Sequence, residues 1–202
     1  PGLYALQAQR YRDVYGATPE QFAEVAVKNK TNGTRNPRAQ LRGSAPSNAE
    51  VLASRMIAEP LTFLQCCPVS DGAGAMVLGR PRGCAGEVRI LASAMSSGRL
   101  WDHRSSEFWG EAPVRRAAGA AYAQAGIRPV DIDVLEIHDS FTIGEILTLE
   151  SLGEASGSVP FNMPAVTQGG FNISGATFQS MVTPLQFLLI KILNLLVPYF
   201  LL

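Results

Sequence analysis

The sequence predicts an α/β protein in which helices cover a β-sheet. Predicted strands alternate with predicted helices in the second half of the chain, an order typical of this fold class. These segments are residues 87–95, 113–125, 132–137 and 143–153. Capping boxes at Thr18, Ser47 and Thr142, each with Glu or Gln three residues later, predict three helix starts. Apolar residues make up 47% of the 202 residues and charged residues 17%, which suits a well-buried core.

Composition excludes several functional classes. The formal net charge is zero, so nothing global indicates nucleic acid as a partner. Three cysteines are present and Cys66 and Cys67 are adjacent, which argues against a disulfide framework and for a reducing compartment. No metal-spaced set of His and Cys occurs, so no metal site is predicted. No secretory signal opens the sequence, and we expect a cytoplasmic location, or a peroxisomal one in a eukaryote, although no peroxisomal C-terminal signal is seen.

The first element is a helix from about Pro19 to Lys30. Its capping box has Pro at the first helical position, and Phe22, Val25 and Ala26 fall on one face. The stretch 28–42, KNKTNGTRNPRAQLR, follows with five basic residues and no acid. Turn signals at Asn-Gly and Asn-Pro inside it predict a basic loop.

The next elements complete the first half of the chain. A helix that begins after Ser47 must stop before Pro60, because proline disfavours the helical conformation of the residue before it. Residues 69–78 predict a turn and a buried strand of small side chains. Residues 80–83, RPRG, predict a boundary between two half-domains.

The second half begins with a predicted strand at residues 87–95. An irregular loop at 96–113 holds both tryptophans, and the Ala-rich helix 113–125 is closed by Gly126. A strand at 132–137 precedes a helix that begins near Ile143 and ends at Gly153. Its apolar face is formed by Ile143, Ile146, Leu147 and the pair Ser151/Leu152.

His138 is the principal candidate for a functional side chain. The residues HDSF, 138–141, stand between the end of a predicted strand and the start of a helix. Open α/β sheets bind ligands at the carboxyl ends of their strands, so His138 is expected to face a ligand. The alternative is a histidine that is satisfied by hydrogen bonds at a strand end and has no chemical role.

The C-terminal residues 185–202, LQFLLIKILNLLVPYFLL, differ from the rest of the chain. They contain no Ala or Gly and a single charge, Lys191. Eighteen apolar-rich residues are near the minimum for a membrane span, although Lys191, Asn194 and Pro198 weaken that interpretation. The alternatives are a buried terminal helix and a tail that was not selected together with the body of the chain.

Two stretches of the sequence resemble the motifs of a known protein family. Residues 59–78, EPLTFLQCCPVSDGAGAMVL, and 132–153, IDVLEIHDSFTIGEILTLESLG, resemble the thiolase superfamily, and within it the thiolases of the sterol-carrier-protein-X or lipid-transfer-protein type. Those enzymes carry a CCP-x-SDGAA strand, an HDCF motif with an E-L-L-x-x-E-x-LG helix, and a KNH…NP stretch that residues 28–42 resemble. The resemblance covers about residues 1–153.

The resemblance implies a layered αβαβα sandwich that is incomplete in this chain. Residues 1–83 would end the first thiolase half with its loop region, and 84–183 would form the second half. Residues 184–202 would be an apolar tail of uncertain origin. The resemblance also implies a homodimer.

The activity implied is acyl transfer on acyl-CoA or 3-oxoacyl-CoA, by thiolytic cleavage or by condensation. Such chemistry needs a thiolate, a base and a donor to the thioester oxygen. His138 matches the HDCF histidine, which would be that donor. The nucleophilic cysteine of the family lies upstream of the residues matched here, since Cys66 and Cys67 match the CCP strand and Cys84 matches nothing. A loose alignment of residues 166–180 puts Asn172 where the family has its catalytic histidine.

Coenzyme A is expected as a substrate, with no tightly bound cofactor. The basic stretch lies over the coenzyme A site in the family, so Lys28, Lys30, Arg35 and Arg38 are candidates to bind its phosphates. Their alternative role is a solvated surface that favours solubility.

Three functions remain open from the sequence. The chain could be part of a thiolase that is inactive in isolation, or a non-catalytic protein that binds coenzyme A or an acyl group. It could also be a subunit of a thiolase-like aldolase in steroid side-chain breakdown. In relatives of that last kind, Tyr typically replaces the HDCF histidine, so His138 argues against it.

Overall fold

A computed structural model of the chain describes residues 1–37, 39, 41, 43–69, 75, 77–84, 86–98, 104–132, 134–135, 137–153 and 172–173. The helices are α1 (Gly2–Tyr15), α2 (Pro19–Arg35), α3 (Asn48–Ala53), α4 (Glu111–Ala125) and α5 (Thr142–Ser151), with 3-10 turns η1 (Phe63–Gln65) and η2 (Pro129–Asp131). The strands are β1 (Met56–Ala58), β2 (Leu61–Thr62), β3 (Val134–Leu135) and β4 (Asn172–Ile173). β1 and β2 pair antiparallel, whereas β3 and β4 pair parallel.

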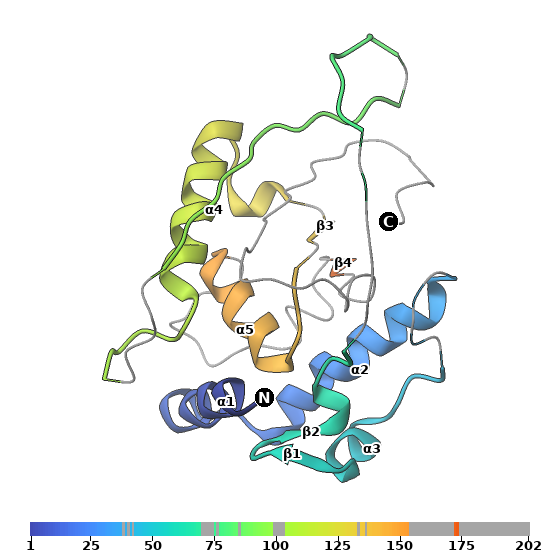
Figure 1. Cartoon of the computed structure of the whole chain (residues 1–202), viewed down its shortest axis with the longest axis vertical. Coiled ribbons are helices and arrows are strands. Elements are labelled where there is room, and N and C mark those ends of the chain that lie inside the picture. The colour runs from blue at the N-terminus through green and yellow to red at the C-terminus, as the bar shows by residue number, and fades with distance from the viewer. Residues whose placement is uncertain are drawn as a thin grey trace.

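Helix α5 lies at the centre of the described structure. It contacts α4 on one side and α1 and α2 on the other (Figure 1). It contributes to two separate clusters of buried side chains, with Ile143, Ile146 and Leu147 in the first, and Leu149 and Leu152 in the second. The apolar face predicted for this helix is therefore confirmed. Because α5 contributes side chains to both clusters, it connects them.

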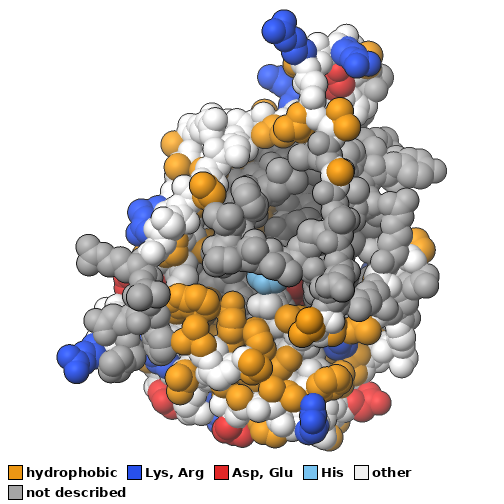
Figure 2. Space-filling view, viewed as in Figure 1, with side chains coloured by type: hydrophobic (Ala, Val, Ile, Leu, Met, Phe, Trp, Pro, Cys, Tyr) orange, Lys and Arg blue, Asp and Glu red, His pale blue; other side chains and the backbone are white. Residues whose placement is uncertain are grey.

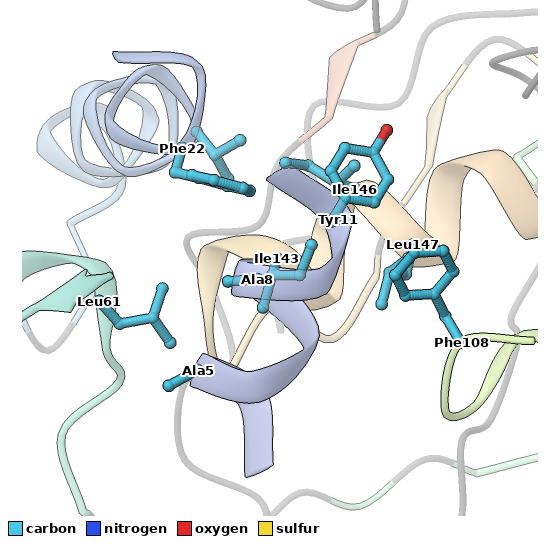
Figure 3. Close-up of a cluster of buried hydrophobic side chains, with 10 residues drawn as sticks. Ala5, Ala8, Tyr11, Phe22, Leu61, Phe108, Ile143, Ile146 and Leu147 are labelled. Carbon is cyan, nitrogen blue, oxygen red and sulfur yellow. The ribbon is translucent and has the colours of Figure 1, made fainter. Parts of the chain in front are cut away.

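The first cluster joins α1, α2, β2 and α5 (Figure 3). Phe22 and Val25 enter it from α2 as predicted, while Ala26 packs between α2 and α3 in a smaller cluster. Tyr11 is the largest side chain that α1 buries in this cluster. This helix was not predicted from the sequence. In this cluster Tyr11 lies against Phe22 and Phe108, with ring centroids 6.4 and 5.6 Å away.

The predicted strand at 87–95 is not a strand in the structure. Its last part runs extended along α4 (Figure 1), with Ala92 buried and Ala94 half-buried against that helix. The Ser93 amide donates to Gln124 Oε1 at 3.1 Å, and Arg116 donates to the Ser97 carbonyl. A strand needs a paired neighbour for its backbone groups, and none of the described residues pairs with this segment.

The predicted buried strand at 69–78 is also wrong for the residues that the structure describes. Val69 is 101% exposed and Val77 is 98% exposed, and Leu78 is exposed as well. The segment has the apolar side chains of a buried strand, but none of the sheets formed by the described residues packs against them. The apolar pattern alone therefore did not determine burial here.

The basic stretch at 28–42 is largely helical rather than a loop. α2 continues to Arg35, five residues past the predicted end, and stops before Pro37. Asn29 and Gly33 are buried on its inner face, and this tertiary packing outweighs the cost of about 1 kcal/mol that glycine imposes inside a helix. Arg38 and Arg42 lie outside the described residues.

The remaining local signals are largely confirmed. The Thr18 amide donates to Gln21 Oε1 at 2.8 Å, and Gly126 closes α4 in a left-handed conformation with φ 69°. α4 begins two residues earlier than predicted. β3 lies within the strand predicted at 132–137, of which residues 133 and 136 are outside the described ones, and α3 ends at Ala53, well before Pro60.

Figure 2 shows apolar side chains gathered over the lower part of the molecule, where Figure 1 places α1 and the β1–β2 hairpin. Leu6 of α1, Met56 of β1 and Phe63 of η1 are among the exposed apolar residues. No helix within the described ranges is long and apolar enough to cross a membrane. Residues 185–202, to which the sequence assigned possible membrane contact, lie outside those ranges.

Ser47 offers a test of the local signal that starts α3. Its Oγ accepts from the Glu50 amide at 3.2 Å, and its own amide donates to Glu50 Oε2 at 2.7 Å. We expect Ser47→Ala to lower the free energy of unfolding by about 1 kcal/mol, because the first turn loses its acceptor. Ser44→Ala, on an exposed residue before the helix, is the control in urea unfolding. Equal stability of the two variants would contradict the cap.

Candidate functional site

His138 lies in the segment that joins β3 to α5, at the end of the short parallel strand pair. The residue is exposed. Partial desolvation of the imidazole nevertheless lowers its pKa below the ordinary value of about 6.5, so the neutral ring prevails at pH 7. A neutral imidazole has one N–H to donate. Its position at a strand end and its neutral state fit a hydrogen-bond donor to a ligand oxygen.

The next residue, Asp139, points into the protein. It is buried, and its Oδ2 accepts a hydrogen bond from Asn29 Nδ2 of α2 at 2.5 Å. The same amide nitrogen donates to Glu145 Oε2 of α5 at 2.7 Å. One buried asparagine therefore connects the loop that carries His138 with the helix that follows it.

Glu145 does not form the capping box that the sequence predicts with Thr142. Phe141 precedes the helix as its N-terminal cap residue, and Thr142 is its first helical residue. The Glu145 side chain is 0% exposed and lies 2.6 Å from Lys28 Nζ, whose side chain is 13% exposed. An ion pair across α2 and α5 is the stronger interaction for a carboxylate that faces the core, so tertiary contact overrides the local capping pattern.

Lys28 also donates to Asn29 Oδ1 at 2.7 Å. The asparagine amide is thereby oriented, with its oxygen toward the cation and its nitrogen toward the two carboxyl groups. We call the set Lys28, Asn29, Asp139 and Glu145 the buried polar cluster. A polar cluster in which each member has a partner holds its elements in one arrangement.

The charges of this cluster do not balance if both acids ionise. Burial raises the pKa of Asp139 to about 7, and the nearby Glu145 carboxylate adds to the increase. Lys28 and the hydrogen bond from Asn29 oppose it. Glu145 has the lysine cation as its direct partner, so Asp139 is the acid that retains a proton near neutral pH.

The backbone around His138 is held from a second direction. The Cys67 amide donates to the Ser140 carbonyl at 2.8 Å, and Cys66 forms an isolated antiparallel bridge with Phe141. The cysteine-containing segment after η1 thus lies beside the HDSF segment. Burial raises the pKa of the Cys66 and Cys67 thiols, so neither is an activated thiolate.

The four predicted coenzyme A ligands occupy different environments. Lys28 is engaged with Glu145, and Lys30 is half-buried with a pKa lowered by burial. Arg35 is exposed at the carboxyl end of α2, and Arg38 lies outside the described residues. The backbone of Asn172, the residue aligned with the family's catalytic histidine, pairs with Val134 in the strand that leads toward His138.

Sequence reasoning did not select Asn29, Asp139 or Glu145 as functional. A signal was available, because Asn29 follows Phe22, Val25 and Ala26 by seven, four and three residues, and so falls on the inward face of α2. Glu145 likewise stands among Ile143, Ile146 and Leu147. A polar residue on an apolar helix face is a candidate for a buried interaction.

Comparison with known proteins agrees with this arrangement. Residues 99–159 match the family model described as thiolase C-terminal domain-like. The chain is 40% identical over 157 residues to the benzoylsuccinyl-CoA thiolase subunit BbsB of Thauera aromatica, a match that covers 75% of the chain and 40% of that protein. It is 35% identical over 162 residues to sterol carrier protein 2 of Gallus gallus, covering 76% of the chain and 29% of that protein.

The fold resembles that of a solved structure, the Ltp2-ChsH2(DUF35) aldolase. The TM-score is 0.72 at 27% identity, over 85% of this chain and 48% of that one. The structural likeness confirms an incomplete thiolase-like α/β sandwich. The chain belongs to the thiolase superfamily, and sterol carrier protein 2 is among its relatives, as the motifs predicted. It spans less than half the length of these curated relatives.

Proposed function

We propose that this chain forms the part of a thiolase-type acyl-CoA enzyme that holds the thioester oxygen through His138. The observation that carries the proposal is the placement of His138 where β3 ends and α5 begins, with its loop fixed by Asn29 and by residues 66–67. Its relatives include a benzoylsuccinyl-CoA thiolase subunit. The reaction is thiolytic cleavage of a 3-oxoacyl-CoA, or the reverse condensation.

His138 would act by donating a hydrogen bond to the oxygen on which negative charge develops. A fixed donor of this kind is typically worth about 3 kcal/mol in the transition state. Cys66 and Cys67 are not activated as nucleophiles, because burial raises the pKa of both thiols. We therefore expect the 202-residue chain to bind coenzyme A or acyl-CoA without turnover, and the complete enzyme to act as a homodimer.

The cations for the coenzyme A phosphates would come from the end of α2 and the residues after it. Arg35 is exposed at the end of α2 and Lys30 is half-buried in the same helix, whereas Lys28 is occupied by Glu145. Contacts between arginine and phosphate are charge-assisted, and those at the surface weaken as salt screens them. Arg35 and Arg38 are thus the residues to test.

We expect Arg35→Glu with Arg38→Glu to weaken coenzyme A binding at low ionic strength about tenfold or more, because each lost charge-assisted bond is worth about 1.5–3 kcal/mol when fully formed. Isothermal titration calorimetry measures the affinity. Arg80→Glu with Arg82→Glu, two exposed arginines far from this helix in the sequence, is the matched control and should leave the affinity unchanged. Equal affinity of the two double variants would remove these residues from the coenzyme A site.

A thiolase-like aldolase subunit is the second candidate. The structural likeness to the Ltp2-ChsH2(DUF35) aldolase favours it. A retro-aldol step releases an enolate without acyl transfer to cysteine, so a hydrogen-bond donor at this position would also serve it. His138 itself favours the thiolase, because relatives of the aldolase kind typically carry Tyr in its place. The two functions differ in co-substrate: cleavage of a 3-oxoacyl-CoA by a thiolase consumes free coenzyme A, whereas retro-aldol cleavage of a 3-hydroxyacyl-CoA does not.

A further inference from the structure

The buried polar cluster contains two carboxyl groups and one cation. Asn29 Nδ2 donates to Asp139 Oδ2 at 2.5 Å and to Glu145 Oε2 at 2.7 Å, so the two acids approach the same nitrogen. Lys28 Nζ contacts Glu145 at 2.6 Å and Asn29 Oδ1 at 2.7 Å. Two buried carboxylates that share one amide nitrogen repel each other, and Lys28 is the lysine in direct contact with the cluster, so the state with one extra proton is favoured.

The location of that proton follows from the contacts. Glu145 touches the lysine ammonium directly and carries the negative charge. Asp139 has no cation at contact distance among the described residues and is partnered by a neutral amide. A protonated Asp139 keeps one oxygen as the acceptor for Asn29 and has an O–H to donate.

We propose that Asn29 and Asp139 are positioning residues for His138, and that the neutral form of the buried Asp139 side chain keeps the HDSF loop in its observed place. Asp139 is the immediate neighbour of His138, and its side chain is the loop's link to α2. The backbone contacts of Cys66 and Cys67 hold the other side of the same loop. Displacing Asp139 would therefore rotate or shift His138 relative to both anchors.

Ionisation of Asp139 is the event that would displace its side chain. The ionisable groups that face Asp139 are Lys28 and Lys30 of α2, Glu145 of α5 and the thiol of Cys67. Lys28 is shared with Glu145, and burial lowers the pKa of Lys30 while the Asp139 charge raises it. Asn29 Nδ2 has one hydrogen for each carboxyl group, so ionisation of Asp139 does not remove that hydrogen bond. Above neutral pH, ionised Asp139 is instead repelled by the buried Glu145 carboxylate, and this repulsion would push the loop away from α5.

The first test measures the titration of Asp139 in the chain with its natural HDSF loop. Carbon-13 labelling of the aspartate carboxyl groups in the 202-residue chain allows each to be titrated by NMR, with Asp139 assigned by the signal missing in Asp139→Asn. We expect this carboxyl to titrate near pH 7, against about 3.9 for an ordinary aspartate. Titration near the ordinary value would overturn the proposal.

The second test follows His138 itself. Its ring signal, assigned by loss in His138→Gln, is expected to show its own titration and a second step near pH 7 that reports Asp139. Asp139→Asn keeps a neutral hydrogen-bonding side chain, so it should preserve the ring signal at pH 6 and abolish the second step. Asp13→Asn, the same change on an exposed residue of α1, should retain both. A second step that persists in Asp139→Asn would overturn the assignment.

Asn29→Ala tests the other member of the pair. We expect it to move the His138 ring signal at pH 6, whereas Thr34→Ala on the exposed side of α2 should not. Circular dichroism establishes that each variant is folded. A folded Asn29→Ala chain with an unchanged His138 signal would contradict the positioning role. Should Asn29→Ala unfold, the carboxyl titration of the unaltered chain still decides the proposal.

The inference rests on the proposed role of His138 as a donor, but its tests use neither coenzyme A nor turnover. Failure of the chain to bind coenzyme A, with a carboxyl titrating near pH 7 and a coupled His138 signal, would contradict the proposed function alone. An ordinary Asp139 titration in a chain that binds coenzyme A would contradict the positioning pair alone.

Discussion

Lys28→Met should lower the free energy of unfolding by about 3–5 kcal/mol, because it leaves Glu145 as a buried charge without its cation. The Glu145 side chain is 0% exposed and Lys28 Nζ lies 2.6 Å from it. Small domains are stable by only about 5–15 kcal/mol, so this change removes a large part of the total. Chemical denaturation followed by circular dichroism measures it, and loss of the folded baseline in water would mark the upper end of the range.

Glu145→Gln is the partner variant in this experiment. The double variant Lys28→Met with Glu145→Gln has no buried charge at this position, and we expect it to be more stable than Lys28→Met alone by about 1–3 kcal/mol. Additive losses in the two single variants and the double variant would mean that the two side chains do not interact. Arg35→Met, at the exposed end of the same helix, controls for the loss of a cation from α2.

Tyr11→Ala is expected to cost about 3–5 kcal/mol, since it removes the largest side chain that α1 buries in the first cluster. Its ring lies 5.6 Å from that of Phe108 and 4.7 Å from that of Tyr15. Without it the buried side chains of α1 are Ala5, Ala8 and the polar Gln7. The loss should appear in the midpoint of urea unfolding, and a cost below about 1 kcal/mol would show that α1 is not an integral part of the core.

Tyr11→Phe separates the hydroxyl from the ring. The Tyr11 hydroxyl donates to Glu150 Oε1 at 2.5 Å. Removing the hydroxyl leaves a half-buried carboxylate without this donor, and we expect a cost of about 1–2 kcal/mol. Burial already raises the pKa of Glu150, and the Tyr11 bond opposes that increase, so the Glu150 pKa should rise further in the variant. An unchanged Glu150 titration would contradict the bond.

The sequence predicted best those elements whose signals are local. α2 begins at its capping box and α4 ends at Gly126, because cap chemistry acts within one turn of the helix. The prediction of a buried strand at 69–78 was wrong, because a strand needs a pairing partner elsewhere in the chain and a local pattern does not reveal that partner. The exposure of Val69 and Val77 shows that an apolar pattern states what a segment can bury, but not what will cover it.

The candidate site also has a part that the sequence could predict and a part that it could not. His138 could be selected, because its position between a strand and a helix is visible locally. The cluster behind it could not be assembled from the sequence, since Asn29 and Asp139 are 110 residues apart and Asn29 and Glu145 are 116 apart. The basic composition of 28–42 suggested a surface loop, and only the ion pair with Glu145 shows that Lys28 belongs to the interior.

The central position of α5 also has a consequence for synthesis on the ribosome. The apolar face of α1 is completed by α5, and the Tyr11 contact with Glu150 spans 139 residues. At about 5–20 residues per second, α1 and α2 must wait on the order of ten seconds before α5 emerges. α3 and β2 emerge early and cover part of α2, but the apolar surface that α1 and α2 bury against α5 stays uncovered until then, so the nascent chain presents a substrate for chaperones and for aggregation. Because its contacts are so distant in sequence, the first cluster should be the slow step in folding.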